Sequence, residues 1–223
     1  TKFFIQIFTS FFILINSPLS QYINNSFKFP LVHILHLFLI ILAVAIINFI
    51  NFMDGLDYLV SGCIIIYFSV YSFTNSLTLL PLLSSLIAFS FWNFPPAKVF
   101  MGDIGSTFLG AIIVSCVFEQ ESPGDSLAYI LLISPLIFDA CICVIRRFFN
   151  SQQILESHKL HLYQRLHQAG WSHARVSIVY VLTSLFISIN YMFFGLNCLI
   201  ILSLLIIIFG VYLDRKFAVN FTS

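Results

Sequence analysis

Eight apolar stretches separated by short polar breaks run through this chain, and they constrain its fold more than any other feature. A helix needs about 20 apolar residues to cross a bilayer, because lipid offers unpaired backbone groups no hydrogen-bond partner. The stretches are Phe3–Ile15, Leu31–Ile50, Leu56–Phe73, Leu77–Phe94, Ser106–Phe118, Leu127–Ile145, Val176–Phe194 and Leu196–Leu213, of which the first and fifth are short. We therefore expect an all-α, polytopic membrane bundle of about eight transmembrane helices.

The composition excludes several classes of protein. Of the 223 residues, 60% are hydrophobic and 9% are charged, whereas soluble domains are about one quarter charged. The net charge of +1 gives no reason to expect nucleic acid as a partner. The five cysteines lie in apolar stretches and are expected to be buried thiols. Without a linker or an internal repeat, residues 1–223 are expected to form a single transmembrane domain.

The basic residues predict which side of the membrane each connection occupies. If the eight stretches alternate in direction, one set of connections contains only Lys28, and the other contains Lys2, Lys98, Arg146, Arg147, Lys159, Arg165, Arg175, Arg215 and Lys216. Because basic loops stay in the cytoplasm, we expect the second set to be cytoplasmic. Asp54, Asp57, Asp103, Glu156 and Asp214 fall on that side too, and Glu119, Glu121 and Asp125 fall outside. Mixed charges at several helix ends on one face indicate a site.

The first polar segment is residues 48–57, with the sequence NFINFMDGLD. Asn48, Asn51 and Asp54 recur every three residues, so neighbouring members would share a helix face. Gly55 permits a sharp turn before Asp57. A carboxylate at the membrane boundary is costly unless it is paired or metal-bound. The segment is a candidate site, and a helix end capped by Asn and Asp is the alternative.

The second polar segment is residues 94–106, with the sequence FPPAKVFMGDIGS. Gly102 and Gly105 flank Asp103 and would let the backbone approach an anion or a metal closely. Ser106 opens the next apolar stretch, where helix N-terminal amides can face a phosphate. Lys98 could neutralise a second phosphate. The alternative is a turn followed by a helix cap.

The third polar segment, residues 146–175, is the longest and is basic. His158, His161 and Arg165 are spaced by three and four residues, and on a helix they would share one face. Cationic or hydrogen-bonding contact with a diphosphate is the interpretation we favour. Zinc is disfavoured, because no second pair of ligands accompanies His161. A solvated loop with no role in binding is the alternative.

Asp139 lies inside the stretch Leu127–Ile145, where an acidic residue is a functional candidate by default. It could pair with Arg146 or Arg147, seven and eight residues later, or it could line the pocket.

Together the three segments resemble the polyprenyl-phosphate N-acetylhexosamine-1-phosphate transferases, the WecA- and MraY-like members of glycosyltransferase family 4. The resemblance is carried by Asn48-x-x-Asn51-x-x-Asp54-Gly55-Leu56-Asp57, by Lys98-Val99-Phe100-Met101-Gly102-Asp103-x-Gly105-Ser106, and by His161 in a basic loop. The three motifs stand in the family's order, and the Val-Phe-Met-Gly-Asp run is specific. The resemblance extends from Lys2 to about Val176.

This resemblance implies a reaction that depends on Mg²⁺ or Mn²⁺ in the bacterial cytoplasmic membrane. A UDP-N-acetylhexosamine would transfer its sugar 1-phosphate to undecaprenyl phosphate and release UMP, which starts a lipid-linked envelope glycan. Asp103 would bind the metal and act in catalysis with Asp54 and His161, the latter beside the diphosphate or the sugar. Candidate substrate-binding residues are Asn48, Asn51, Asp57, Lys98, Ser106, His158 and Arg165.

The sequence departs from the family pattern in two places. The family has an adjacent Asp pair just before a segment resembling residues 2–6, and here that pair would lie upstream of Thr1. We therefore expect a longer protein, of which this chain is the C-terminal part and is inactive alone. MraY-like members have a run of consecutive His where this chain has His158-x-x-His161. That difference favours the branch that initiates O-antigen or related surface polysaccharides.

A multi-spanning transporter with an acidic cation site is the alternative function. It predicts acids near the bilayer midplane and related repeats in the two halves. Here most acids lie at one face, and no repeat is visible. A purely structural membrane subunit is a third hypothesis, and neither alternative explains the paired motifs. The identity of the sugar and the formation of a homodimer are left open.

Overall fold

The computed structural model describes residues 2–153 and 159–221, and within these residues it contains helices and no strand. The elements are α1 (Lys2–Ile15), α2 (Pro18–Ser26), α3 (Leu31–Met53), α4 (Leu59–Thr74), the 3-10 turn η1 (Leu77–Leu79), α5 (Leu80–Asn93), α6 (Gly102–Phe118), α7 (Pro123–Leu132), α8 (Ser134–Phe149), α9 (Leu162–Gln168) and α10 (His173–Phe217). Large apolar side chains such as Phe4, Ile104 and Phe193 are mostly exposed, as expected of a surface that lipid covers. The predicted all-α membrane bundle is confirmed.

The number of membrane spans differs from the prediction. Two helices are long and apolar enough to cross a membrane, α3 with 23 residues and α10 with 45. If the bent pairs α1–α2 and α7–α8 each count as one broken span, the described residues provide up to four. Helices α4 and α6, and η1 together with α5, are apolar but shorter. The predicted count of about eight is therefore not confirmed, although the eight stretches lie largely within helices.

The predicted stretch Leu127–Ile145 is divided between two helices that meet at a sharp bend. Helix α7 ends at Leu132 and α8 begins at Ser134, with an angle of 81° between them. Pro135 lies in the first turn of α8, where its missing N–H costs nothing. Inside a continuous helix the same proline would remove a hydrogen bond and clash with the preceding turn. The chain therefore breaks before Pro135 and starts a new helix.

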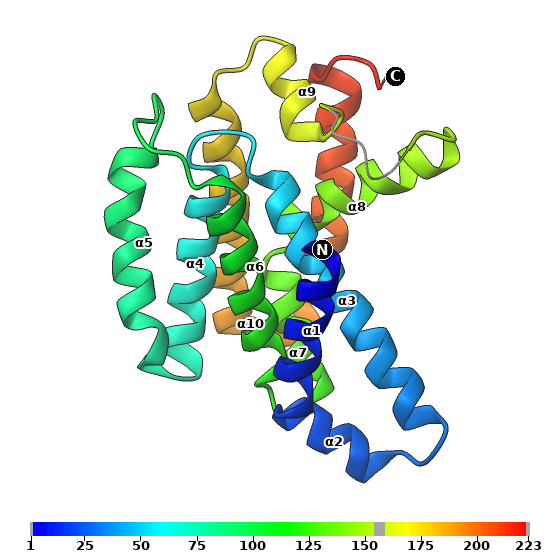
Figure 1. The fold of residues 1–223 in the computed structure, drawn as a ribbon. Coiled ribbons are helices and arrows are strands. Elements are labelled where there is room, and N and C mark those ends of the chain that lie inside the picture. Colours follow the sequence, from blue (N-terminus) through cyan, green and yellow to red (C-terminus); the bar gives the residue numbers. More distant parts are fainter. Residues whose placement is uncertain (1, 154–158, 222–223) are drawn as a thin grey trace.

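Helix α10 consists of two arms that meet at Gly195 (Figure 1). Gly195 has φ of 71° and ψ of −163°, a conformation that glycine adopts far more readily than other residues. Val179 and Thr183 of the first arm line the same pocket as Ile206 and Gly210 of the second. The arms therefore lie side by side, and they correspond to the predicted stretches Val176–Phe194 and Leu196–Leu213.

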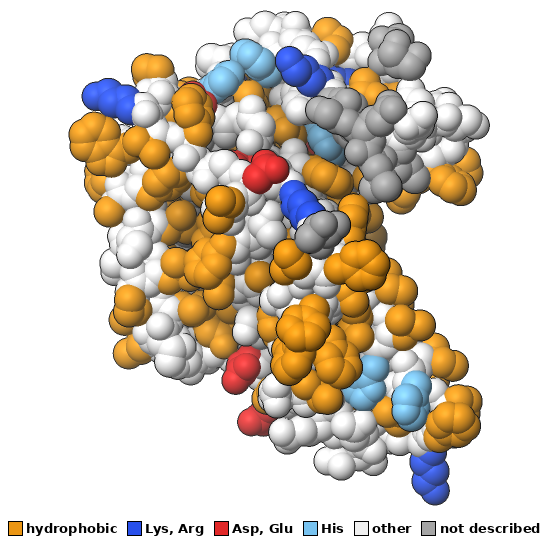
Figure 2. Space-filling model, viewed as in Figure 1, with side chains coloured by type: hydrophobic (Ala, Val, Ile, Leu, Met, Phe, Trp, Pro, Cys, Tyr) orange, Lys and Arg blue, Asp and Glu red, His pale blue; other side chains and the backbone are white. Residues whose placement is uncertain are grey.

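The connections between helices gather at two ends of the bundle. Figure 1 shows the α3–α4 and α5–α6 connections, α9 and the start of α10 at one end, and the α2–α3, α4–α5 and α6–α7 connections at the other. Figure 2 shows hydrophobic side chains across the middle of the visible face and charged ones mainly toward its ends. The three polar segments of the sequence thus lie at the same end.

Helices α3 and α6 approach closely because Gly110 has no side chain. A Cβ atom at Gly110 would lie 2.9 Å from the Cα atom of Ile47. Small residues allow this kind of close backbone approach between membrane helices. Gly110 lies one turn after Ser106, so the contact sets the distance between the helices that carry the first two polar segments.

Candidate active site

Asp54 and Asp103 meet at the end of the bundle. Asp54 caps the C-terminal end of α3, and Asp103 lies in the first turn of α6. Burial, and secondly the charge of Asp103, raise the pKa of Asp54 from 3.8 to about 7. The Asp103 side chain is 86% exposed. A partly buried carboxylate thus lies close enough to an open one for its pKa to be affected by the charge of the second.

Gly102 begins α6 with a φ of 68°, which glycine adopts without strain. A Cβ atom there would meet no heavy atom within 4 Å. The backbone conformation, and not lack of space, therefore requires glycine beside Asp103. The predicted close approach of Gly102 to an anion stays a prediction.

Lys2 links the two acidic motifs, although it was not among the predicted site residues. Its Nζ atom lies 3.7 Å from Oδ2 of Asp103 and donates to Oδ1 of Asn51 over 3.2 Å. Asn51 in turn donates from Nδ2 to Oγ of Ser106 over 2.8 Å. Asn51, Asp103 and Ser106 are thus brought together, from α3 and α6. The position of Lys2 before a long apolar run was the only signal in the sequence.

Asn48 lies one turn before Asn51 but is buried away from the carboxylates. Its side chain exchanges two hydrogen bonds with Gln6 of α1, at 2.9 and 3.3 Å. This reciprocal amide pair satisfies two polar groups in an apolar surrounding. Asn48 therefore fastens α1 to α3, and its predicted contact with substrate stays a prediction. Gln6, the lone amide in its apolar stretch, was missed.

Asp57 fastens the second polar segment to α10. One of its carboxylate oxygens accepts from the backbone N–H of Ala97 over 3.2 Å and lies 3.1 Å from Nδ1 of His173. The Asp57 carbonyl also accepts from the hydroxyl of Ser177 over 2.6 Å. These contacts hold the α3–α4 connection against both neighbouring segments.

Lys98 is exposed, and its ammonium group lies over the ring of Trp92 at 5.3 Å from the ring centroid. Trp92 belongs to the last turn of α5, so the contact is local. The predicted role of Lys98 in binding a phosphate is not tested by this arrangement.

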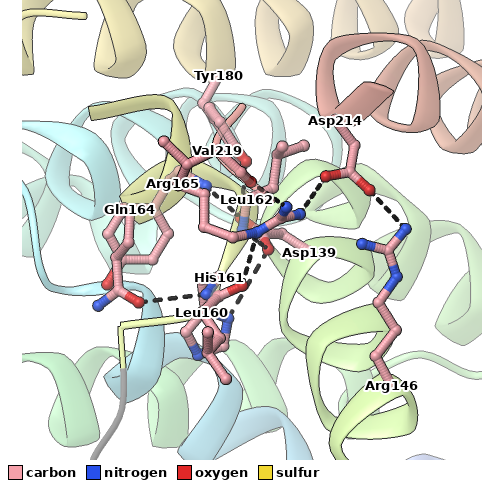
Figure 3. Close-up of polar contacts among 11 residues, drawn as sticks. Asp139, Arg146, Leu160, His161, Leu162, Gln164, Arg165, Tyr180, Asp214 and Val219 are labelled. Carbon is pink, nitrogen blue, oxygen red and sulfur yellow. Dashed lines mark hydrogen bonds and ion pairs between the residues drawn. The ribbon is translucent and has the colours of Figure 1, made fainter. Parts of the chain in front are cut away.

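His161 lies deeper, beside Asp139 (Figure 3). It is 2% exposed, with Nδ1 3.7 Å from Oδ1 of Asp139. The same carboxylate accepts from the backbone N–H groups of Leu162 at 2.7 Å and Tyr163 at 3.1 Å, and from the hydroxyl of Tyr180 at 2.7 Å. Asp139 therefore joins α8, α9 and the first arm of α10. The sequence left open whether Asp139 pairs with Arg146 or Arg147 or lines a pocket. The partners of its carboxylate are instead Leu162, Tyr163 and Tyr180.

Arg165 is buried among groups of the protein itself (Figure 3). Its guanidinium donates to the carbonyls of Leu160 at 3.1 Å and Val219 at 2.8 Å, and it forms an ion pair with Asp214. Arg146 binds the other oxygen of Asp214 at 2.5 Å. These contacts tie α9 to the second arm of α10 and to α8, and contact between Arg165 and a diphosphate stays a prediction.

Of the three residues expected to share a helix face, His161 and Arg165 can be placed, and only Arg165 lies within a helix. His161 is the N-cap of α9, with extended backbone, and the helix begins only at Leu162. Gln164 completes the cap by accepting from the N–H of His161 over 3.2 Å. An N-cap residue has a non-helical backbone, so the helical spacing assumed for His161 and Arg165 does not apply. His158 lies outside the residues that the structure describes.

The donors at Asp54 and Asp103 are suited to Mg²⁺. The described residues contain no group of three or more His, Cys, Asp or Glu side chains placed to hold a metal ion. Mg²⁺, however, is usually held by one or two carboxylates, with water and substrate phosphates as its other ligands. The two negative charges repel each other, and a divalent cation bound between them would remove this repulsion. The pair therefore fits Mg²⁺, and Mn²⁺ by the same chemistry.

Comparison with known proteins agrees with these motifs. Residues 1–120, more than half of the chain, match the sequence profile of Glycosyl transferase family 4. This matched part contains Asn51, Asp54, Asp103 and Ser106.

Individual relatives carry related names. The chain is 34% identical to a Bacillus subtilis (strain 168) protein named Probable undecaprenyl-phosphate N-acetylglucosaminyl 1-phosphate transferase. The aligned region of 149 residues covers 61% of this chain and 42% of that protein. The chain is 29% identical to a Lactobacillus acidophilus Phospho-N-acetylmuramoyl-pentapeptide-transferase, over 62% of this chain and 45% of the relative. A Mycobacterium leprae Decaprenyl-phosphate N-acetylglucosaminephosphotransferase is 30% identical over 44% of this chain and 28% of the relative. The chain thus spans under half the length of these relatives.

Proposed function

Because this chain belongs to glycosyl transferase family 4, we propose that the protein transfers an N-acetylhexosamine 1-phosphate from a UDP-sugar to undecaprenyl phosphate. The products would be UMP and a lipid-linked sugar that starts an envelope glycan. The names of the relatives from Bacillus subtilis and Lactobacillus acidophilus support this reaction class. No observation favours the transporter alternative.

One observation carries the proposal: contacts from Lys2 to Asp103 and Asn51, and from Asn51 to Ser106, join the two acidic motifs at the end of the bundle where the polar connections gather, and the charge of Asp103 reaches Asp54 there. Phosphoryl transfer depends chiefly on charge neutralisation and positioning. When it is bound between these carboxylates, Mg²⁺ or Mn²⁺ supplies neutralising charge to the phosphates. The exposed carboxylate of Asp103 is the proposed metal ligand that meets the substrate.

The remaining residues of this cluster would position the reacting groups. Lys2 places a cation 3.7 Å from Asp103 and so adds to the positive potential that the phosphates meet. Asn51 is held by Lys2 and Ser106, which fixes its amide beside the carboxylates. We assign the nucleotide to this side of the site, bounded by Asp57, and the diphosphate or sugar to the side nearer His161.

The lipid substrate explains the location of the site. A polyprenyl phosphate presents its phosphate at the membrane interface, so catalytic groups are needed at helix ends. By the distribution of Lys and Arg, this face is the cytoplasmic one, in the bacterial cytoplasmic membrane. Within the family we favour the branch that initiates O-antigen or related surface polysaccharides, because of the His158-x-x-His161 pattern.

The proposal is tested with the complete protein that carries this chain. The purified protein is incubated with undecaprenyl phosphate, Mg²⁺ and each of several UDP-N-acetylhexosamines, and UMP release is measured. We expect release that requires the lipid phosphate and that chelation of the metal abolishes. A folded protein that releases no UMP from any of these sugars, or that moves a solute across vesicles instead, would overturn the proposal.

A further inference from the structure

Tyr163 joins the third polar segment of the chain to the first. It is the second residue of α9, and its side chain is fully buried. Its hydroxyl donates to the backbone carbonyl of Phe52 over 2.9 Å, although the two residues are 111 positions apart. Phe52 lies two residues before Asp54, in the last turn of α3. The contact therefore reaches the end of the helix that leads into the carboxylate of Asp54.

Helix α3 cannot itself supply a donor to this carbonyl. The last four carbonyls of a helix have no donor within it, and α3 ends at Met53. Tyr163 satisfies one of them from another segment. Burial, and secondly the charges of Asp139 and Asp54, raise the pKa of Tyr163. Its hydroxyl therefore keeps the proton that it donates.

Gly55 leaves room for the same hydroxyl on the other side of Asp54. A Cβ atom at Gly55 would overlap Oη of Tyr163 and would lie 3.1 Å from its Cζ atom. Gly55 is outside the positive-φ region, so its backbone conformation is open to other residues. Close packing against Tyr163 therefore requires glycine after Asp54.

The rest of Tyr163 is held firmly by α8 and by the start of α9. Its backbone N–H donates to Oδ2 of Asp139 over 3.1 Å. Its ring stacks on that of His161, with centroids 5.7 Å apart and planes 20° apart. The His161 ring also lies 6.2 Å from the ring of Phe52. A fixed side chain thus contacts the residues on both sides of Asp54.

We propose that Tyr163 is a positioning residue that holds Asp54 in place to bind Mg²⁺ together with Asp103. This inference rests on the proposed function. Through Phe52 and Gly55, Tyr163 places the Asp54 carboxylate before the cation arrives. A ligand that is positioned in advance loses less freedom on binding, so the metal binds more tightly.

Tyr163→Phe in the complete protein removes the hydroxyl and keeps the ring. Two Mg²⁺ concentrations are measured: the one that gives half-maximal UMP release, and the one that gives half of the Mg²⁺-dependent rise in the thermal unfolding midpoint. We expect both to rise by about twofold to tenfold, which corresponds to the net contribution of one hydrogen bond. The maximal rate at saturating Mg²⁺ should change less than this, since bound metal restores the position of Asp54.

A merely structural role predicts a different result. Loss of folded protein would lower the maximal rate and leave both Mg²⁺ concentrations unchanged. Tyr67→Phe is the matched control, because Tyr67 is also buried, in α4, and its hydroxyl has no hydrogen-bond partner among the residues that the structure describes. This variant should require the same Mg²⁺ concentrations as wild type.

Gly55→Ala tests the same contact from the other side. The added Cβ atom would displace the Tyr163 hydroxyl from the Phe52 carbonyl, so this variant should also raise both Mg²⁺ concentrations. The double variant should raise them by less than the product of the two single effects, because each change removes the same contact.

Four results would each overturn the proposal. These are unchanged Mg²⁺ concentrations in Tyr163→Phe, an equal change in Tyr67→Phe, single effects that multiply in the double variant, and a wild-type unfolding midpoint that does not respond to Mg²⁺. The thermal measurement does not depend on turnover. A wild type that binds Mg²⁺ but releases no UMP would therefore remove the transferase function, while the variants would still decide whether Tyr163 positions Asp54.

Discussion

Asn51 donates a hydrogen bond to Ser106 over 2.8 Å. The two residues are 55 positions apart, and the bond joins the end of α3 to the beginning of α6. It therefore holds together the motifs that supply Asp54 and Asp103. The closely packed Gly110 supports the same junction one turn further along α6.

Asp103→Ala in the complete protein should abolish most UMP release while membrane insertion is kept. The side chain is 86% exposed, so its removal costs little stability, whereas loss of the metal ligand should lower turnover by about 10²- to 10³-fold. Turnover is measured with saturating Mg²⁺, and insertion by membrane fractionation. Asp125→Ala, in α7 at the opposite end, is the matched control and should behave as wild type. Normal turnover by Asp103→Ala would remove this residue from the metal site.

The pKa of Asp54 predicts how the metal-free stability depends on pH. Because the pKa rises from 3.8 unfolded to about 7 in the fold, the folded protein binds this proton more tightly than the unfolded chain. The resulting contribution to stability is fully present below pH 3.8 and is lost as the pH rises through about 7. The metal-free protein should therefore lose stability, relative to Asp54→Asn, as the pH rises from about 4 to about 7, and the difference should level off above that range.

Thermal unfolding of both proteins in detergent measures this difference. The other titrating groups are shared, so they cancel in the comparison. Added Mg²⁺ should restore the stability of wild type at the higher pH and have a smaller effect on Asp54→Asn, because ligand binding stabilises the state that binds it. Parallel pH curves for the two proteins would contradict the assignment.

Gly110→Ala should destabilise the protein by about 1–3 kcal/mol, the usual cost of overpacking. The added Cβ atom would lie 2.9 Å from Cα of Ile47, and a backbone atom cannot move aside as a flexible side chain can. Gly124→Ala in α7 is the control, since its Cβ would meet only ordinary contacts at 3.7 Å. The thermal unfolding midpoints of the two variants are compared with that of wild type. Equal midpoints for Gly110→Ala and Gly124→Ala would show that α3 and α6 move apart at no cost in stability.

The sequence predicts the helical stretches, and it predicts that the three polar segments lie at one face of the membrane, because both depend on local patterns of apolar and charged residues. Apolar runs mark the helices, and the polar breaks between them place the motifs at one end. The break inside Leu127–Ile145 was also readable, since Pro135 marks a helix start. Its apolar surroundings made the stretch look continuous.

The partners of Asp139 could not be predicted in the same way. Sequence spacing suggested Arg146 or Arg147, but the residues that contact Asp139 are 23, 24 and 41 positions away. Such contacts depend on how α9 folds back against α8 and α10. The pairing of Arg165 with Asp214, 49 positions away, has the same origin.

The role of Asp139 in holding α9 gives a final prediction. Asp139→Asn replaces one accepting oxygen by an amide that cannot accept, so one or more donors in this buried site lose their partner. Leaving a buried donor unpaired costs about 1–3 kcal/mol. The backbone amides of Leu162 and Tyr163 should then exchange hydrogen faster than in wild type.

Tyr180→Phe is the control, because it removes a donor and leaves the two backbone bonds intact. Unchanged exchange at these two amides in Asp139→Asn would show that α9 is held by its other contacts, the Arg165–Asp214 ion pair first among them.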